Sequence, residues 1–97
     1  MLAEDVNIKF AGFEPTQEVR KAVYFVLNQL HLKSPSQSFL SATFTLTNGI
    51  FEGVINVTSA AENFVVKSSD SQVIQLSNKL FDKLGQKLEK WKSLRCL

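Results

Sequence analysis

The segment 71–97 constrains the fold most, because its apolar residues recur at three- and four-residue steps. With about 3.6 residues per helical turn, residues at these steps share one face of a helix. The spacing therefore predicts one long amphipathic helix that must pack against another layer of the molecule. The apolar stripe consists of Val73, Leu76, Leu80, Leu84, Leu88, Trp91 and Leu94.

A second stripe on the same predicted helix is basic and consists of Lys79, Lys83, Lys87 and Lys90. These lysines fall within a sector of about 80° along the border of the apolar face, whereas Asp82 and Glu89 lie elsewhere. Stacked like charges repel one another by a few tenths of a kcal/mol per pair. The stripe is therefore slightly costly unless a polyanion lies alongside it, and it indicates phosphate contact; the alternative is a solvated helix face.

The charge is divided unevenly along the chain. The net charge of +2 does not by itself indicate a nucleic-acid partner. From Lys67 onward, however, seven basic residues stand against three acidic ones, whereas residues 1–66 carry four basic and six acidic residues. Such a dipolar domain is typical of a protein that lays one face on phosphates.

Residues before the long helix supply the remaining elements. Thr16 is a suitable N-cap for a helix that ends before Ser34-Pro35, and Asn48-Gly49 predicts a tight hairpin turn. Alternating apolar residues predict strands at 6–10, 39–47, 50–58 and 63–68. The buried stripe of the first helix is predicted to be Val19, Ala22, Val23, Val26, Leu27 and Leu30.

The order of these elements is β-α-β-β-β-α, which predicts an α+β fold. Two amphipathic helices and a sheet with one apolar face form a two-layer sandwich, with both helices packed on one face of a four-stranded mixed sheet. The first strand is expected to lie parallel to the second, because a helix connects them. With 97 residues, of which 44% are hydrophobic and 21% charged, the chain is expected to form a single domain over residues 1–97.

Several classes of function lack the residues they require. One His and one Cys provide no metal-ligand cluster, and neither His31 nor Cys96 can be grouped into a catalytic set. We therefore expect no enzyme activity, no metal, no cofactor and no small-molecule substrate. The sequence has no signal peptide and no run of about 20 apolar residues, so we expect a cytoplasmic protein without a membrane partner.

Two segments resemble one known family. Residues 80–92 contain an apolar pair, Asp-Lys-Leu, another Leu four residues on and Lys-x-Lys, as does the closing helix of the hibernation-promoting factor family. These ribosome-associated translation inhibitors were once labelled sigma-54 modulation proteins. Thr16–Arg20 is similar to the start of the family's first helix. Together with the strand order, the resemblance covers nearly the whole chain.

The resemblance implies a short-form family member whose single domain binds the small ribosomal subunit in the mRNA-tRNA channel. It implies stoichiometric translation inhibition during ribosome hibernation under stress, with rRNA phosphates and not DNA as ligand. The positions that match the family's basic pattern are Arg20, Lys83, Lys90 and Lys92, whereas Lys79 and Lys87 come from the stripe alone. The predicted RNA-binding set is therefore Arg20, Lys79, Lys83, Lys87, Lys90 and Lys92. The chain departs from the family pattern at Gln72, Ile74, Val26 and Gln29.

The alternative is a diverged α+β module or regulator that binds a protein and not the ribosome. It would use the sheet edge near Phe64 or the border of the helix stripe. The aromatic residues do not favour a base-stacking sheet of the RNA-recognition type, because the element order differs. Phe39, Phe51 and Phe64 are mostly expected in the core, and Trp91 in the core or at its edge.

Overall fold

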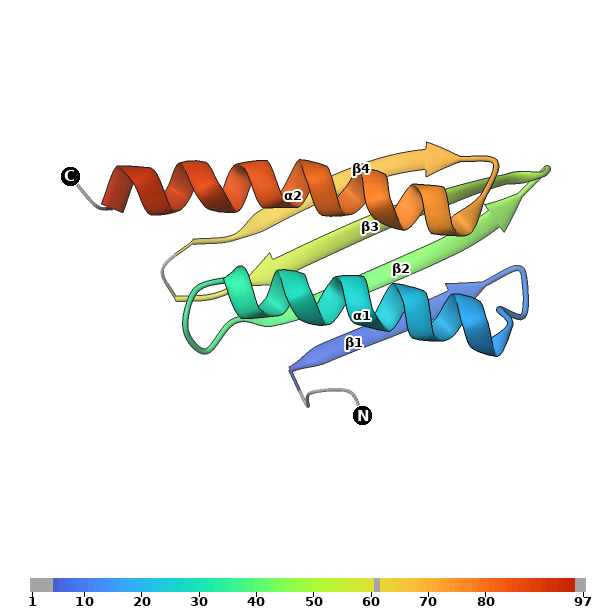
Figure 1. Cartoon of the computed structure of the whole chain (residues 1–97), viewed down its shortest axis with the longest axis horizontal. Coiled ribbons are helices and arrows are strands. Elements are labelled where there is room, and N and C mark those ends of the chain that lie inside the picture. The colour runs from blue at the N-terminus through green and yellow to red at the C-terminus, as the bar shows by residue number, and fades with distance from the viewer. Residues whose placement is uncertain (1–4, 61, 96–97) are drawn as a thin grey trace.

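The computed structural model describes residues 5–60 and 62–95, without the side chain of Arg95; Ala61 and Cys96 lie outside the described residues. Its elements follow the predicted order (Figure 1). They are β1 (Val6–Ala11), α1 (Gln17–Lys33), β2 (Phe39–Thr47), β3 (Ile50–Thr58), β4 (Phe64–Asp70) and α2 (Val73–Arg95).

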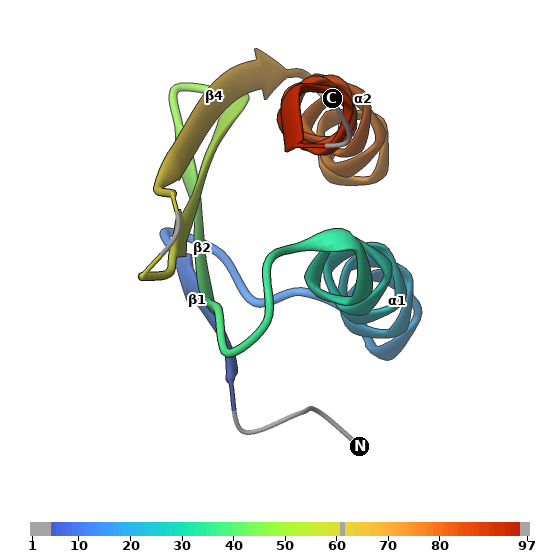
Figure 2. The same cartoon turned by 90° about the vertical axis from the view of Figure 1, so that its left-hand side faces the viewer.

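The four strands form one mixed sheet in the order β1-β2-β3-β4. β1 pairs with β2 in parallel, and the other two pairs are antiparallel. Both helices lie on the same face of the sheet (Figure 2). The predicted fold class is confirmed, and β1 and β4 are the two edge strands.

Local sequence signals fix the ends of several elements. The Thr16 hydroxyl accepts a hydrogen bond from the Val19 amide at 3.2 Å, which caps α1. Asn48 and Gly49 adopt φ values of 52° and 79°, as the primed turn between β2 and β3 requires. In the last turn of α1, the His31 ring nitrogen Nε2 lies 3.1 Å from the carbonyl oxygen of Ser38 in the following loop.

The core lies between the sheet and the two helices. α1 contributes Val23, Leu27 and Leu30, all fully buried. The α2 stripe is buried at five positions, which are Val73, Leu76, Leu80, Leu84 and Leu88. These apolar faces account for the amphipathic pattern that the sequence shows in both helices.

Gly53 of β3 sets how closely α2 approaches the sheet. A Cβ atom at this position would lie 2.6 Å from Leu80 Cδ1 and 3.3 Å from Leu76 Cδ2. The missing side chain therefore creates the space that the leucines of α2 occupy. The close approach also brings the lysines of α2 within reach of β4.

Three sequence expectations need correction. Leu94 is 63% exposed, because Trp91 already packs on Phe64 at the start of β4 and the last turn of α2 extends past that strand (Figure 1). Phe39 is 55% exposed, whereas Phe64 is buried and Phe51 half-buried. The strand predicted at 63–68 spans Phe64–Asp70.

Candidate functional site

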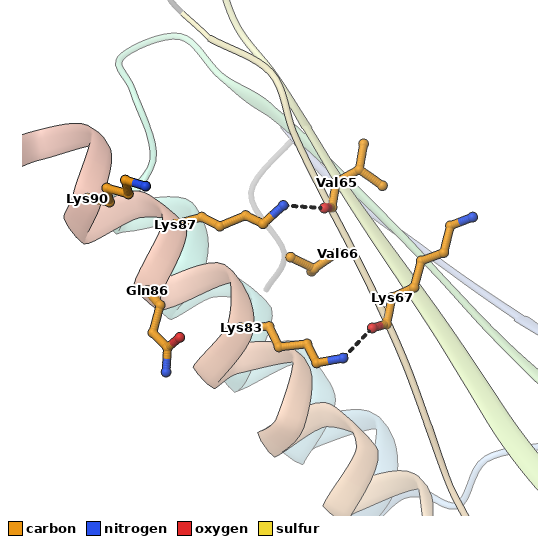
Figure 3. Close-up of a pocket in the computed structure, with 7 residues that line it drawn as sticks. All are labelled: Val65, Val66, Lys67, Lys83, Gln86, Lys87 and Lys90. Atoms are coloured by element: carbon orange, nitrogen blue, oxygen red, sulfur yellow. Dashed lines mark hydrogen bonds between the residues drawn. The ribbon is translucent and has the colours of Figure 1, made fainter. Parts of the chain in front are cut away.

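The lysine stripe of α2 contacts the outer edge of β4. Three ammonium groups each donate a hydrogen bond to a backbone carbonyl of that strand, and Figure 3 shows two of these bonds. The bonds join Lys79 to Ser69 (3.2 Å), Lys83 to Lys67 (2.8 Å) and Lys87 to Val65 (3.2 Å). We call Lys79, Lys83 and Lys87 the lysine ladder.

The ladder exists because the repeats of helix and strand nearly match. Four residues of an α-helix rise about 6 Å, and two residues of a strand span about 6.7 Å. Each step of four residues along α2 therefore meets every second carbonyl of β4, which runs in the opposite direction. Alternate carbonyls of a strand point to the same side, so all three bonds lie on the strand's outer edge.

These bonds change the interpretation of the lysine stripe. β4 is an edge strand, and among the described residues no strand lies beside its outward backbone groups. Lysine side chains are a common protection for such edges. The expectation that only a polyanion offsets the repulsion within the stripe is therefore wrong, because the carbonyl oxygens of β4 already provide acceptors for three of its four lysines.

Asp70 closes the first end of the ladder. Its Oδ2 atom lies 2.8 Å from Lys79 Nζ, and its Oδ1 atom accepts a hydrogen bond from the Gln72 amide at 3.0 Å. The Lys79 hydrogen bond is the main cause that lowers the pKa of the Asp70 carboxyl below its ordinary value, and the Gln72 amide adds to this effect. Asp70 thus links the end of β4 to the start of α2.

Three adjoining hollows follow β4 and α2 and together form a basic groove. Lys67, Lys83, Lys87 and Lys90 recur among their linings, and we define the groove by these four residues. The largest hollow has a volume of about 470 Å³ and is drawn in Figure 3. Its lining is Val65, Val66, Lys67, Lys83, Gln86, Lys87 and Lys90.

Lys67 was missing from the predicted set. The alternation in β4 did place it opposite the buried Val66, so the sequence indicated an exposed lysine on that strand. It did not indicate that this strand is the sheet edge next to the lysine stripe. The neighbourhood of β4 and α2 is a tertiary feature that no local pattern encodes.

Lys90 does not continue the four-residue spacing of the lysine ladder. It follows Lys87 by three residues, and the position four residues on is Trp91, whose ring packs edge-on against Phe64 at 6.3 Å. Lys90 and Lys92 are exposed, and within the described residues their ammonium groups make no hydrogen bond or ion pair. The predicted stripe therefore contains two kinds of lysine.

Arg20 lies apart from the other predicted residues. It stands near the start of α1, with its guanidinium 3.8 Å from the Glu14 carboxylate and 5.6 Å from the centre of the Phe10 ring. The two helices run in the same direction, so Arg20 lies at the opposite end of the helix layer from Lys90 and Lys92 (Figure 1). Of the predicted set, the structure gathers the five lysines along α2 and leaves Arg20 outside.

Known structures share this β-α-β-β-β-α sandwich over nearly its whole length. The N-terminal domain of Protein Y from Thermus thermophilus matches with a TM-score of 0.76 and 15% identity, covering 94% of this chain and 99% of that domain. A ribosomal subunit interface protein from Coxiella burnetii matches with a TM-score of 0.73 and 16% identity, covering 91% and 97%. Both are of the hibernation-promoting factor type that the sequence resembles, so the resemblance is confirmed at the level of the fold.

Sequence comparison adds nothing to this result. No protein-family model and no curated protein sequence matches the chain. Over their described residues, neither α1 nor α2 is long and apolar enough to cross a bilayer.

Proposed function

We propose that this protein is a non-catalytic ribosome-binding factor that inhibits translation by occupying the mRNA-tRNA channel of the small subunit. The observation that carries the proposal is the basic groove, which lies on a fold shared with Protein Y and a ribosomal subunit interface protein. The groove gathers four lysines along one edge of the molecule, and rRNA phosphates are the matching ligand.

Lys90 and Lys92 form the first contacts in this proposal. Their exposed ammonium groups can bind a phosphate without giving up a hydrogen bond within the described residues. Lys67, on the open face of β4, lies across the groove from Lys90 and extends the same basic surface (Figure 3). Flexible lysines on phosphates position a protein without reading bases, which suits a groove of folded RNA.

The lysine ladder contributes in a second step. Lys83 and Lys87 must each exchange a neutral carbonyl oxygen for a phosphate oxygen, and Lys79 must leave the Asp70 carboxylate as well. Because hydrogen bonds to charged acceptors are the stronger ones, a nearby phosphate can draw the ammonium groups off the strand. The ladder lysines therefore gain less from RNA than Lys90 and Lys92 do.

Sedimentation with small ribosomal subunits over a range of salt concentrations tests the proposal. Each neutralised phosphate contributes about 0.7 to 0.9 to the slope of log affinity against log salt, so Lys67→Gln/Lys90→Gln/Lys92→Gln should flatten the slope by about 2. The matched control, Lys9→Gln/Lys21→Gln/Lys33→Gln, removes the same charge away from the groove and should leave that slope nearly unchanged. Co-migration with neither subunit at low salt would disprove ribosome binding.

In-vitro translation tests the inhibitory step separately. Purified protein should suppress synthesis at about one copy per ribosome, because it occupies a channel and does not turn over. Arg20→Gln is measured alone, since this residue lies outside the groove. If only that variant loses inhibition, the binding surface is the start of α1 and not the groove.

A further inference from the structure

The outer edge of β4 carries a regular row of backbone groups. In an antiparallel strand the N–H and C=O groups of one residue point to the same side. The carbonyls of Val65, Lys67 and Ser69 point outward to the lysine ladder, so their amides point outward as well. β4 therefore presents three donor-acceptor pairs in the spacing of a strand, with the acceptors held by lysines.

A strand laid against this edge would meet positive charge on both of its faces. Lys83 and Lys87 reach the edge from α2, whereas the Lys67 side chain extends from β4 away from that helix (Figure 3). Successive side chains of a strand point to opposite faces, so acidic residues on either face of an added strand would find a lysine. The edge therefore fits an extended segment with several carboxylates.

The other occupants fit less well. A second copy of β4 paired about its centre would place one Lys67 opposite the other, and like charges directly opposite each other destabilise a strand pair. The second copy would also bring its own ladder to the same gap. RNA matches the lysines, but it has no row of N–H and C=O groups to pair with the strand.

We propose that the outer edge of β4 is a docking site for an extended acidic peptide segment of a partner protein, which adds as a fifth strand. On docking, the ladder ammonium groups turn from the carbonyls of β4 to carboxylates, which are those of the peptide for Lys83 and Lys87 and that of Asp70 for Lys79. The released carbonyls accept hydrogen bonds from the peptide, and the outward amides donate to it. The lysines thus disfavour pairing of β4 with a neutral or basic strand and favour pairing with an acidic one.

Amide hydrogen exchange of the full chain tests the proposal directly. The probe is a peptide of about eight alternating glutamates and valines, the length of an ordinary strand. At saturation, exchange of the Val65, Lys67 and Ser69 amides should slow by about tenfold or more. The same peptide N-methylated at every second residue keeps its charge but cannot pair with a strand, and it should give no protection. Equal binding of both peptides, or unchanged exchange at the three amides, would overturn the proposal.

Two variants at one position separate backbone pairing from charge. Lys67→Pro removes one outward amide, and an edge strand tolerates proline on its open side. This variant should lose protection at Val65 and Ser69, whereas Lys67→Gln should bind more weakly but keep it. Exchange at Val66 and Ser68, which pair with β3, shows whether the proline variant remains folded. If Lys67→Pro keeps full protection, β4 is not the docking strand.

The proposed ribosome binding fails or succeeds independently of this test. An oligouridylate or inorganic polyphosphate that binds the same lysines should leave exchange at the three edge amides unchanged. If either polyanion protects those amides as the peptide does, protection reports charge alone and the strand-docking proposal is wrong. Peptide protection without ribosome co-sedimentation would leave docking intact and remove the translational role.

Discussion

The two parts of α2 have the same sequence pattern but different surroundings. In the anchored part, residues 73–88, the apolar stripe is buried and three lysines bond to β4. In the terminal part, residues 89–95, Leu94 is 63% exposed, and Lys90 and Lys92 make no hydrogen bond or ion pair within the described residues. The difference arises because β4 begins at Phe64, so the sheet ends before the helix does. The helical spacing of apolar residues therefore predicts which residues share a face of α2, but not where the sheet that covers this face ends.

The comparison also divides the roles of the lysines. Those of the anchored part hold the edge of the protein's own sheet, whereas those of the terminal part are available to a partner without any rearrangement. Ligands that reach the anchored lysines must compete with backbone carbonyls. Matched substitutions in the two parts should therefore have different effects.

Leucine truncation should separate the two parts most clearly. Leu84→Ala removes a fully buried side chain and should lower the free energy of unfolding by about 2–4 kcal/mol. Leu94→Ala removes an exposed one and should change it by less than about 0.5 kcal/mol. Urea titration measures both values. Similar losses for the two variants would mean that the sheet covers the whole helix.

A methyl group at Gly53 should disturb the anchored part alone. The added Cβ would lie 2.6 Å from Leu80 Cδ1, so Gly53→Ala should destabilise the protein by about 1–3 kcal/mol through overpacking. Gly85→Ala is the matched control, since its added Cβ would meet no described atom within 4 Å apart from the adjoining backbone of α2. Because alanine is the better helix former, Gly85→Ala should raise the free energy of unfolding by up to about 1 kcal/mol. Denaturant titration that finds Gly53→Ala neutral would show that α2 can move away from the sheet without cost.

The sequence was sufficient for most of the fold. Strands β2 and β3 were predicted with their observed bounds, because alternation and Asn48-Gly49 are strong local signals. The role of Gly53 was not predicted, since a glycine within a strand gives no sign of which helix lies above it. β4 was predicted at 63–68 but spans Phe64–Asp70, and its end was missed because Ser69 and Asp70 are polar.

The candidate site was predictable only in part. The regular spacing of lysines correctly identified one basic face of α2. Its contact with the carbonyls of β4 depends on two elements packed in register, and the sequence states the period of each but not their alignment. Lys67 was missed for the same reason. Arg20 was included because it matches a family sequence pattern, and such a pattern does not give the distance between Arg20 and the lysines of α2.

The two groups of lysines should differ modestly in their effect on stability. Lys79→Gln/Lys83→Gln/Lys87→Gln removes three surface hydrogen bonds but also relieves repulsion, so the loss should be below about 1 kcal/mol. Lys90→Gln/Lys92→Gln should leave the free energy of unfolding unchanged within error. Parallel urea titrations of the two variants provide the comparison. A larger loss from the terminal pair would contradict the assignment of the ladder to the anchored part.

Asp70 should give the smallest effect on the free energy of unfolding, and the pH dependence of this effect identifies its cause. Its folded pKa is lowered, chiefly by Lys79, so the unfolded chain binds the proton more tightly. The stabilisation from this pair is therefore fully present above the unfolded pKa, near pH 4, and is lost as the pH falls through the folded value. Asp70→Asn should be less stable than the parent at pH 6, and the difference should shrink on acidification. Lys79→Gln should show the same trend, and the double variant should add little to either change. A difference between Asp70→Asn and the parent that persists undiminished in acid would mean that Asp70 acts through the Gln72 amide and not through its charge.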